Sequence, residues 1–183
     1  MNIDGSDQKQ LTQTEGGYAE FAAPDGRVYY RAGFSGALRK IDVETKTEND
    51  LADIGGWAHA FAPSGDAVAS FVRDPENGDR IKIVLRQLAD RSIVDVISDV
   101  GDEKSDPIDL EWSSDGQSIL YVISRSGEYE LWKHSLGSQK HALVARLGSE
   151  PIERVTVSPD GRSIATVRGS WLHDAFLITG LKY

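Results

Sequence analysis

Four arginines recur at a similar place in the sequence, each near the end of an alternating apolar segment that predicts a β-strand: Arg31, Arg73, Arg125 and Arg168. The guanidinium group suits recognition of carboxylates, and exposed tryptophans serve as contact anchors. We therefore predict that one rim of the molecule frames a site for an anionic or peptide ligand, which four further residues complete: Trp57, His59, Trp171 and His173. Ordinary surface arginines and core-edge tryptophans are the alternative interpretation.

The sequence lacks the patterns of common catalytic and metal sites. The stretch nearest to a nucleophile elbow, GFSGA at 33–37, lacks the second glycine of G-x-S-x-G and stands in a predicted hairpin. The four histidines show neither H-E-x-x-H nor paired spacing, and the acidic segments 73–80 and 98–106 are interpreted as solvated turns. No glycine-rich phosphate loop opens a helix. We predict no catalytic residue, no metal, no cofactor and no enzymatic activity.

A repeated hairpin supplies the elements that must position these residues. The turn VSPDG, which ends at Gly161, recurs earlier as AAPDG, FAPSG and WSSDG. Two apolar residues seven positions apart flank each turn, as Val157 and Ile164 do in the last copy. Apolar pairs farther along predict a third strand, and segments such as 93–101 and 141–148 predict a fourth. Four short strands, repeated without an amphipathic helix, predict an all-β chain of four-stranded antiparallel blades, a β-propeller.

The repeat divides one domain, 1–183, into about four blades with the approximate bounds 17–56, 57–106, 107–150 and 151–183. The last copy has only three strands, whereas residues 3–16 match the end of a third strand followed by an outer one. We therefore predict that this N-terminal strand completes the last blade, because pairing covers a bare strand edge. Three arrangements stay open: a closed ring of four blades, a piece of a larger ring, and a ring shared by two copies of the chain.

The composition limits the class of partner. A formal net charge of −9 disfavours binding to nucleic acid or to anionic membranes. No apolar run is long enough to predict membrane insertion, and the N-terminus lacks the basic and apolar regions of a signal peptide. Since the chain has no cysteine, it suits oxidising and reducing compartments alike, and its location stays open. We predict a protein or peptide partner.

The segment MNIDGSDQKQLTQTEGGYAEFAAPDGRVYY and the later SPDGRSIATVRG resemble the repeat of TolB-type β-propellers, over nearly the whole chain. In that family MN-D-G continues a preceding strand, so the resemblance implies that Met1 is internal to a longer protein. The tail, SPDGRSIATVRGSWLHDAFLITGLKY, is similar to the last repeat of bacterial propellers that follow a kinase or winged-helix regulator domain, although GSWLHDAFLI replaces a Ser/Thr-rich turn.

The resemblance implies a non-catalytic recognition module, the C-terminal part of a bacterial sensor or signalling protein. Similar repeats also form the substrate-gating propeller of prolyl-oligopeptidase-like serine peptidases. That role is the alternative, and the present sequence contains no part of the catalytic domain of those enzymes.

Overall fold

A computed structural model describes most of the chain: Ser6, Gln8, 10–12, 17–32, 38–51, 54–78, 80–98, 100–101 and 104–169. The described residues are dominated by strands in which apolar and polar side chains alternate, as the two-residue period of a strand requires. Within them, no helix is long and apolar enough to cross a membrane. The all-β prediction is confirmed.

The strands form four antiparallel sheets, each built from consecutive strands. The first sheet contains β1 (Gly17–Ala22), β2 (Arg27–Ala32), β3 (Leu38–Asp42) and β4 (Glu48–Asp50). The second contains β5 (Trp57–Phe61), β6 (Ala67–Asp74), β7 (Arg80–Gln87) and β8 (Ile93–Ile97), with the short 3-10 helix η1 (Pro75–Asn77) between β6 and β7. The third contains β9 (Ser105–Trp112), β10 (Ser118–Arg125), β11 (Glu128–Ser135) and β12 (Lys140–Gly148). The fourth contains β13 (Ile152–Val157) and β14 (Ile164–Arg168).

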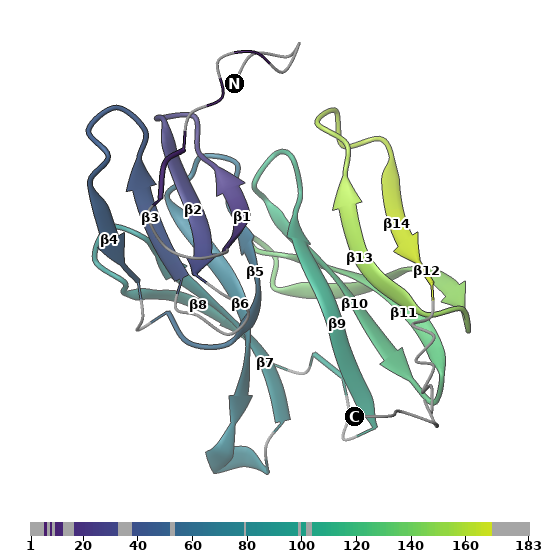
Figure 1. Cartoon of the computed structure of the whole chain (residues 1–183). Coiled ribbons are helices and arrows are strands. Elements are labelled where there is room, and N and C mark those ends of the chain that lie inside the picture. The colour runs from purple at the N-terminus through teal and green to yellow at the C-terminus, as the bar shows by residue number, and fades with distance from the viewer. Residues whose placement is uncertain are drawn as a thin grey trace, which may run out of the picture.

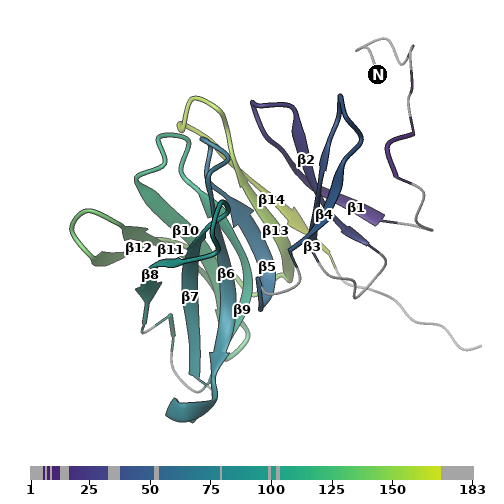
Figure 2. The same ribbon diagram turned by 90° about the vertical axis from the view of Figure 1, so that its left-hand side faces the viewer.

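The sheets stand side by side around a common centre, like blades (Figures 1 and 2). The first strand of each sheet, namely β1, β5, β9 and β13, faces this centre, and β4, β8 and β12 lie at the outside (Figure 1). This is the strand order of a propeller blade, in which the chain runs from the centre outwards before it begins the next blade. The inner strands therefore bring four distant parts of the sequence together.

Apolar side chains pack between consecutive blades in three buried clusters. One cluster joins the first and second blades through Tyr29 and Phe61, and another joins the second and third through Phe71 and Tyr121. The third cluster, which includes Val155, joins the third and fourth blades. Among the described residues no such cluster joins the fourth blade to the first. The described part of the chain is therefore an arc with three blade-to-blade interfaces.

The repeated turn connects the two inner strands of each blade. In the last blade Gly161 has a φ of 68°, which favours glycine, and its N–H donates to the carbonyl of Ser158 at 2.8 Å. The Ser158 hydroxyl donates to Oδ1 of Asp160 at 2.6 Å and accepts the N–H of Ser163 at 2.9 Å. The third blade repeats these bonds with Ser113, Asp115 and Ser118. Serine and aspartate thus satisfy backbone groups that the turn leaves unpaired.

The predicted completion of the fourth blade falls largely outside the described residues. Within the segment 3–16 only Ser6, Gln8 and 10–12 are described, and none of these belongs to a strand. Residues 170–183, which include the predicted third strand of that blade, also lie outside the described part. Ring closure by the N-terminal strand therefore stays a prediction.

Candidate functional site in the central channel

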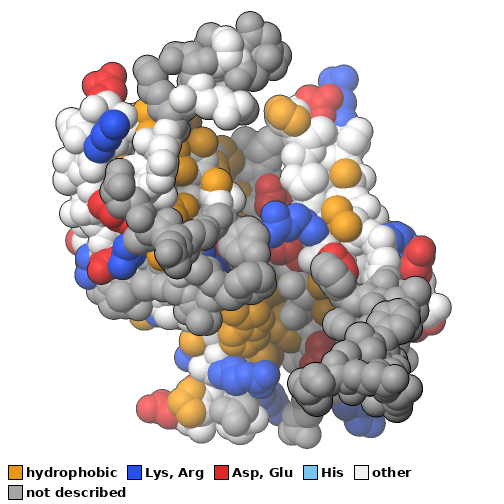
Figure 3. Space-filling model, viewed as in Figure 1, with side chains coloured by type: hydrophobic (Ala, Val, Ile, Leu, Met, Phe, Trp, Pro, Cys, Tyr) orange, Lys and Arg blue, Asp and Glu red, His pale blue; other side chains and the backbone are white. Residues whose placement is uncertain are grey.

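A cavity of about 590 Å³ lies where the inner strands of all four blades meet. Its lining includes Glu20 on β1, His59 on β5, Asp109 and Glu111 on β9, and Arg154 on β13. Figure 3 shows acidic and basic side chains in the hollow between the first and last blades. Polar groups on four separate strands thus converge on one channel, which is where propellers have room for a ligand.

Arg31 and His59 connect two blades at the wall of this channel. Nε of Arg31 lies 3.2 Å from Oε1 of Glu20, and its Nη2 lies 2.6 Å from Nδ1 of His59. A guanidinium group can only donate, so Nδ1 accepts and the imidazole is neutral. Burial and, secondarily, the charge of Arg31 lower the pKa of His59 to about 4. Arg31 therefore already forms an ion pair with Glu20 and a hydrogen bond with His59.

Two carboxyl groups face the channel from alternate positions of β9. Oδ2 of Asp109 accepts the backbone N–H of Val155 at 2.8 Å, which ties β9 to β13. Burial raises the pKa of Asp109, and burial together with the nearby Asp109 raises the pKa of Glu111 to about 7. In the described part of the chain Glu111 makes no ion pair within 4 Å, although the charge of Arg154 favours its ionised form. Glu111 is thus a partly desolvated carboxyl group that no cation of the described residues approaches within 4 Å.

A second cavity, of about 330 Å³, continues the channel towards the hairpin turns. It shares Glu20, His59 and Glu111 with the first cavity, so these three residues lie between the two. The rest of its wall is largely apolar: Phe21, Ala60, Phe61, Pro63, Trp112, Val157 and Pro159. The channel is therefore lined mostly by apolar side chains on the side of the turns, and by acidic side chains farther in.

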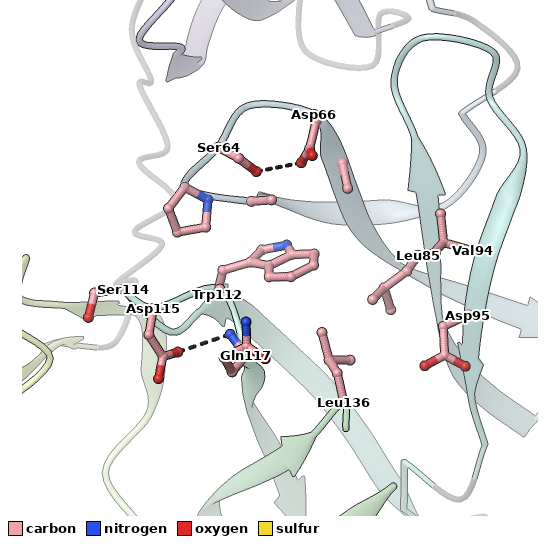
Figure 4. Close-up of a pocket in the computed structure, with 14 residues that line it drawn as sticks. Ser64, Asp66, Leu85, Val94, Asp95, Trp112, Ser114, Asp115, Gln117 and Leu136 are labelled. Carbon is pink, nitrogen blue, oxygen red and sulfur yellow. Dashed lines mark hydrogen bonds between the residues drawn. The ribbon is translucent and has the colours of Figure 1, made fainter. Parts of the chain in front are cut away.

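A third cavity, of about 540 Å³, separates the second and third blades (Figure 4). The ring of Trp112 lies near its centre, with Leu85 and Leu136 on one side and the turns of Ser64 and Asp115 at its edge (Figure 4). Nε1 of Trp112 donates to the carbonyl of Ala60 at 3.0 Å, which joins the two blades. None of the six predicted rim residues that the structure describes lines this cavity.

The structure separates the predicted rim residues into small local groups. Arg31 and His59 meet at the channel, as described above. Arg73 lies over the Trp57 ring, with its guanidinium carbon 5.5 Å from the ring centroid, and both residues belong to the second blade. Neither of them lines the channel cavities.

The remaining rim residues do not approach the channel either, where they are described. Nε of Arg125 donates to the Ser105 hydroxyl at 3.3 Å. Nη1 of Arg168 donates to the carbonyl of Leu147 at 2.9 Å and lies 3.7 Å from Glu150. Trp171 and His173 lie outside the described residues. The proposed role of this set in ligand binding stays a prediction.

The residues that sequence reasoning missed are the acids and the arginine of the channel: Glu20, Asp109, Glu111 and Arg154. Glu20 and Glu111 immediately precede the apolar anchors Phe21 and Trp112. Because side chains alternate along a strand, a residue next to an anchor that packs between blades lies on a different face. A polar residue at this position in two copies was the available signal.

Comparison with solved structures finds propellers with the same arrangement of strands. The crystal structure of TolB from Acinetobacter baumannii matches 90% of this chain with a TM-score of 0.70 and 19% sequence identity. A putative TolB from Agrobacterium tumefaciens matches 88% of the chain with a TM-score of 0.62 and 13% identity. The fold is that of a β-propeller, and these structural neighbours are TolB-type propellers. At this level of identity the likeness concerns the fold alone.

Other propellers share the architecture. Dipeptidyl peptidase 4 from Porphyromonas gingivalis matches 86% of the chain with a TM-score of 0.56 and 11% identity. This propeller chain spans 41% of the Acinetobacter TolB chain, 61% of the Agrobacterium chain and 30% of the peptidase chain. No model of a protein family and no curated protein sequence matches it.

Proposed function

We propose that this propeller is a non-catalytic recognition module whose central channel receives a basic group of a protein or peptide partner. The observation that carries the proposal is Glu111, a half-buried carboxyl group at the junction of the two channel cavities that makes no ion pair within 4 Å among the described residues. A lysine or arginine side chain would supply a positive charge beside Glu111, and its aliphatic part would pack against the apolar side chains of the second cavity. Ionisation of Glu111 would then become favourable.

The charges of the channel favour a cation over an anion. Four acids line the larger cavity, namely Glu20, Asp109, Glu111 and Glu153, against the two cations Arg31 and Arg154. His59 is neutral, and Arg31 already binds Glu20 and His59. An incoming carboxylate would therefore meet like charge, in contrast to the anionic ligand that the arginine pattern suggested. A basic peptide is the ligand that this charge distribution supports.

Matched peptides test the proposal. The probes are pairs of capped hexapeptides. The two members of a pair differ only at one central position, which is lysine in one and its uncharged analogue norleucine in the other. The flanking residues vary from pair to pair. We expect the lysine peptides to bind more tightly and Glu111→Gln to remove this preference. Glu128→Gln is the control, because Glu128 is an exposed acid at the far end of the third blade. Equal binding of both peptides, or equal losses in both variants, would overturn the proposal.

We also propose that the four blades are an arc of a larger ring, in a longer bacterial sensor or signalling protein with a kinase or winged-helix domain. The fraction of the TolB chains that the propeller spans supports this, because it covers 41% of one and 61% of the other. The sequence of the full gene tests this proposal, which expects a kinase or winged-helix domain upstream of the propeller. A mass of 40 kDa in solution, twice the 20.0 kDa of one chain, would instead support a ring shared by two copies.

The second candidate is the substrate-gating propeller of a serine peptidase. The fold shared with dipeptidyl peptidase 4 is the observation that favours it. A Ser-His-Asp hydrolase domain encoded with the propeller would support this role, and a regulator domain in its place would exclude it.

A further inference from the structure

The outer hairpin of the third blade brings two histidines together, far from the channel. His134 on β11 stands directly opposite His141 on β12, and Nδ1 of His134 lies 3.1 Å from Nε2 of His141. Opposite residues on paired strands place their side chains on the same face. His134 is only 2% exposed, whereas His141 lies at the surface. The pair therefore combines one ring fixed by packing with one that solvent reaches.

The two rings do not point directly at one another. Their planes are tilted by 62°, and their centroids are 4.4 Å apart. A head-on N–H···N hydrogen bond with the same nitrogen separation would place the centroids more than about 5 Å apart. The rings are thus inclined to the line between the nitrogens. Two nitrogens that bind one tetrahedral zinc ion at about 2.0–2.1 Å are about 3.3 Å apart, close to the observed separation.

A neighbouring hydroxyl can hold His141 in the tautomer that a metal needs. Nδ1 of His141 lies 2.9 Å from Oη of Tyr121, which is 1% exposed. If Nδ1 carries the proton and donates it to Oη, the lone pair of Nε2 is free to bind. Metal-ligating histidines usually donate their other N–H to an oxygen acceptor in this way.

Two further features favour a cation beside His134. Burial lowers the pKa of His134, which favours the neutral ring with a lone pair for an ion. Asp95 from the second blade adds a negative charge, which favours a cation near this ring. Oδ2 of Asp95 accepts a hydrogen bond from Nε2 of Gln139 at 2.9 Å, which holds the carboxylate against this hairpin.

We propose that Nδ1 of His134 and Nε2 of His141 together bind one divalent transition-metal ion, Cu²⁺, Ni²⁺ or Zn²⁺, with water in the other positions. Imidazole suits all three ions, and Cu²⁺ is expected to bind most tightly. The described part of the chain contains no group of three or more histidine, cysteine, aspartate or glutamate ligands. The site therefore holds an exchangeable ion rather than a structural one with four protein ligands. This inference is independent of the proposed function.

Calorimetric titration of the untagged protein with Zn²⁺ and Cu²⁺ tests the site, since a polyhistidine tag would itself bind these ions. We expect one ion per chain, and His141→Ala should weaken binding by about tenfold or more, because even residues that only hydrogen-bond to a metal ligand contribute that much. His141 is exposed, so its removal leaves the core intact; thermal unfolding without metal checks this. Tyr121→Phe should weaken binding less, and His59→Gln, which alters a distant histidine, should leave it unchanged.

The electron paramagnetic resonance spectrum of the Cu²⁺ complex gives a second readout. We expect coupling to two imidazole nitrogens in the natural protein and to one or none after His141→Ala. Absence of binding to either ion, unchanged affinity in His141→Ala, or a loss confined to His59→Gln would overturn the proposal.

Discussion

Nη2 of Arg31 lies 2.6 Å from Nδ1 of His59, and this contact joins the first blade to the second at the channel wall. The bond requires a neutral imidazole, because both partners would otherwise be donors. Burial and the charge of Arg31 lower the pKa of His59 from 6.5 to about 4. The contact therefore links the stability of the blade interface to pH.

We expect His59→Gln to reduce the loss of stability in acid. In the natural protein the unfolded chain takes up a proton at this histidine below about pH 6.5, whereas the folded chain does so only near pH 4. Stability therefore falls as the pH drops through this window, by at most about 3 kcal/mol from this group. Glutamine can still accept the Arg31 bond but does not titrate. Urea unfolding at pH 7 and pH 4.5 should show a smaller difference for the variant, and an equal difference would contradict this account.

Glu111→Gln should change the stability of the protein at high pH rather than in acid. Burial raises the pKa of Glu111 to about 7 from 4.5, so the folded state binds the proton more tightly than the unfolded state. Stability from this group is present below pH 4.5 and is lost as the pH rises through 7. The variant should be more stable than the natural protein at pH 8, by at most about 3 kcal/mol, and show no such gain at pH 4.5. Glu128→Gln should change stability at neither pH. A gain of the same size at both pH values would mean that packing, rather than charge, is the cause.

The hairpins were predictable because their signal is local. The seven-residue step holds in the structure: Phe61 lies opposite Val68, Trp112 opposite Ile119, and Val157 opposite Ile164. In the first copy the partners are instead Phe21 with Tyr29 and Ala22 with Val28. A turn that sits one residue later, together with a bulge in β1, moves the register by one position. Alternation and turn chemistry therefore predict the blades but not every pairing.

The channel was harder to predict because alternation does not distinguish a channel wall from a solvent-exposed face. Asp109 and Glu111 have the pattern of ordinary outward-facing strand residues, and only the assembly of the blades around the channel partly buries them. The contacts of Arg125 and Arg168 depend on the reach of long side chains, which spacing does not encode; Arg168 reaches from the fourth blade to Leu147 of the third. His134 and His141 were a missed local signal, because they stand at equal distances from the centre of their hairpin.

Gly65→Ala should destabilise the protein more than Gly26→Ala. Both glycines have positive φ, 74° and 81°, so alanine costs about 1–2 kcal/mol of backbone strain at either position. A Cβ atom on Gly65 would also lie 3.1 Å from Cβ of Ala23 in the preceding blade, whereas one on Gly26 meets nothing within 4 Å. Crowding should therefore add about 1 kcal/mol at Gly65. Equal midpoints and slopes in urea unfolding of the two variants would show that the turns of adjacent blades move apart with no measurable loss of stability.

Trp112→Phe should weaken the interface between the second and third blades. Its indole N–H donates to the carbonyl of Ala60 across that interface at 3.0 Å, and the side chain is only 8% exposed. Loss of a buried hydrogen bond costs about 1–3 kcal/mol, to which the smaller ring adds lost packing in the cluster around Phe71 and Tyr121. Trp132→Phe is the matched control, because that indole is partly exposed and donates to Glu130 in the same sheet. We expect a larger loss of unfolding free energy for Trp112→Phe. If the two losses were equal, the bond between the blades would contribute no more than one within a blade.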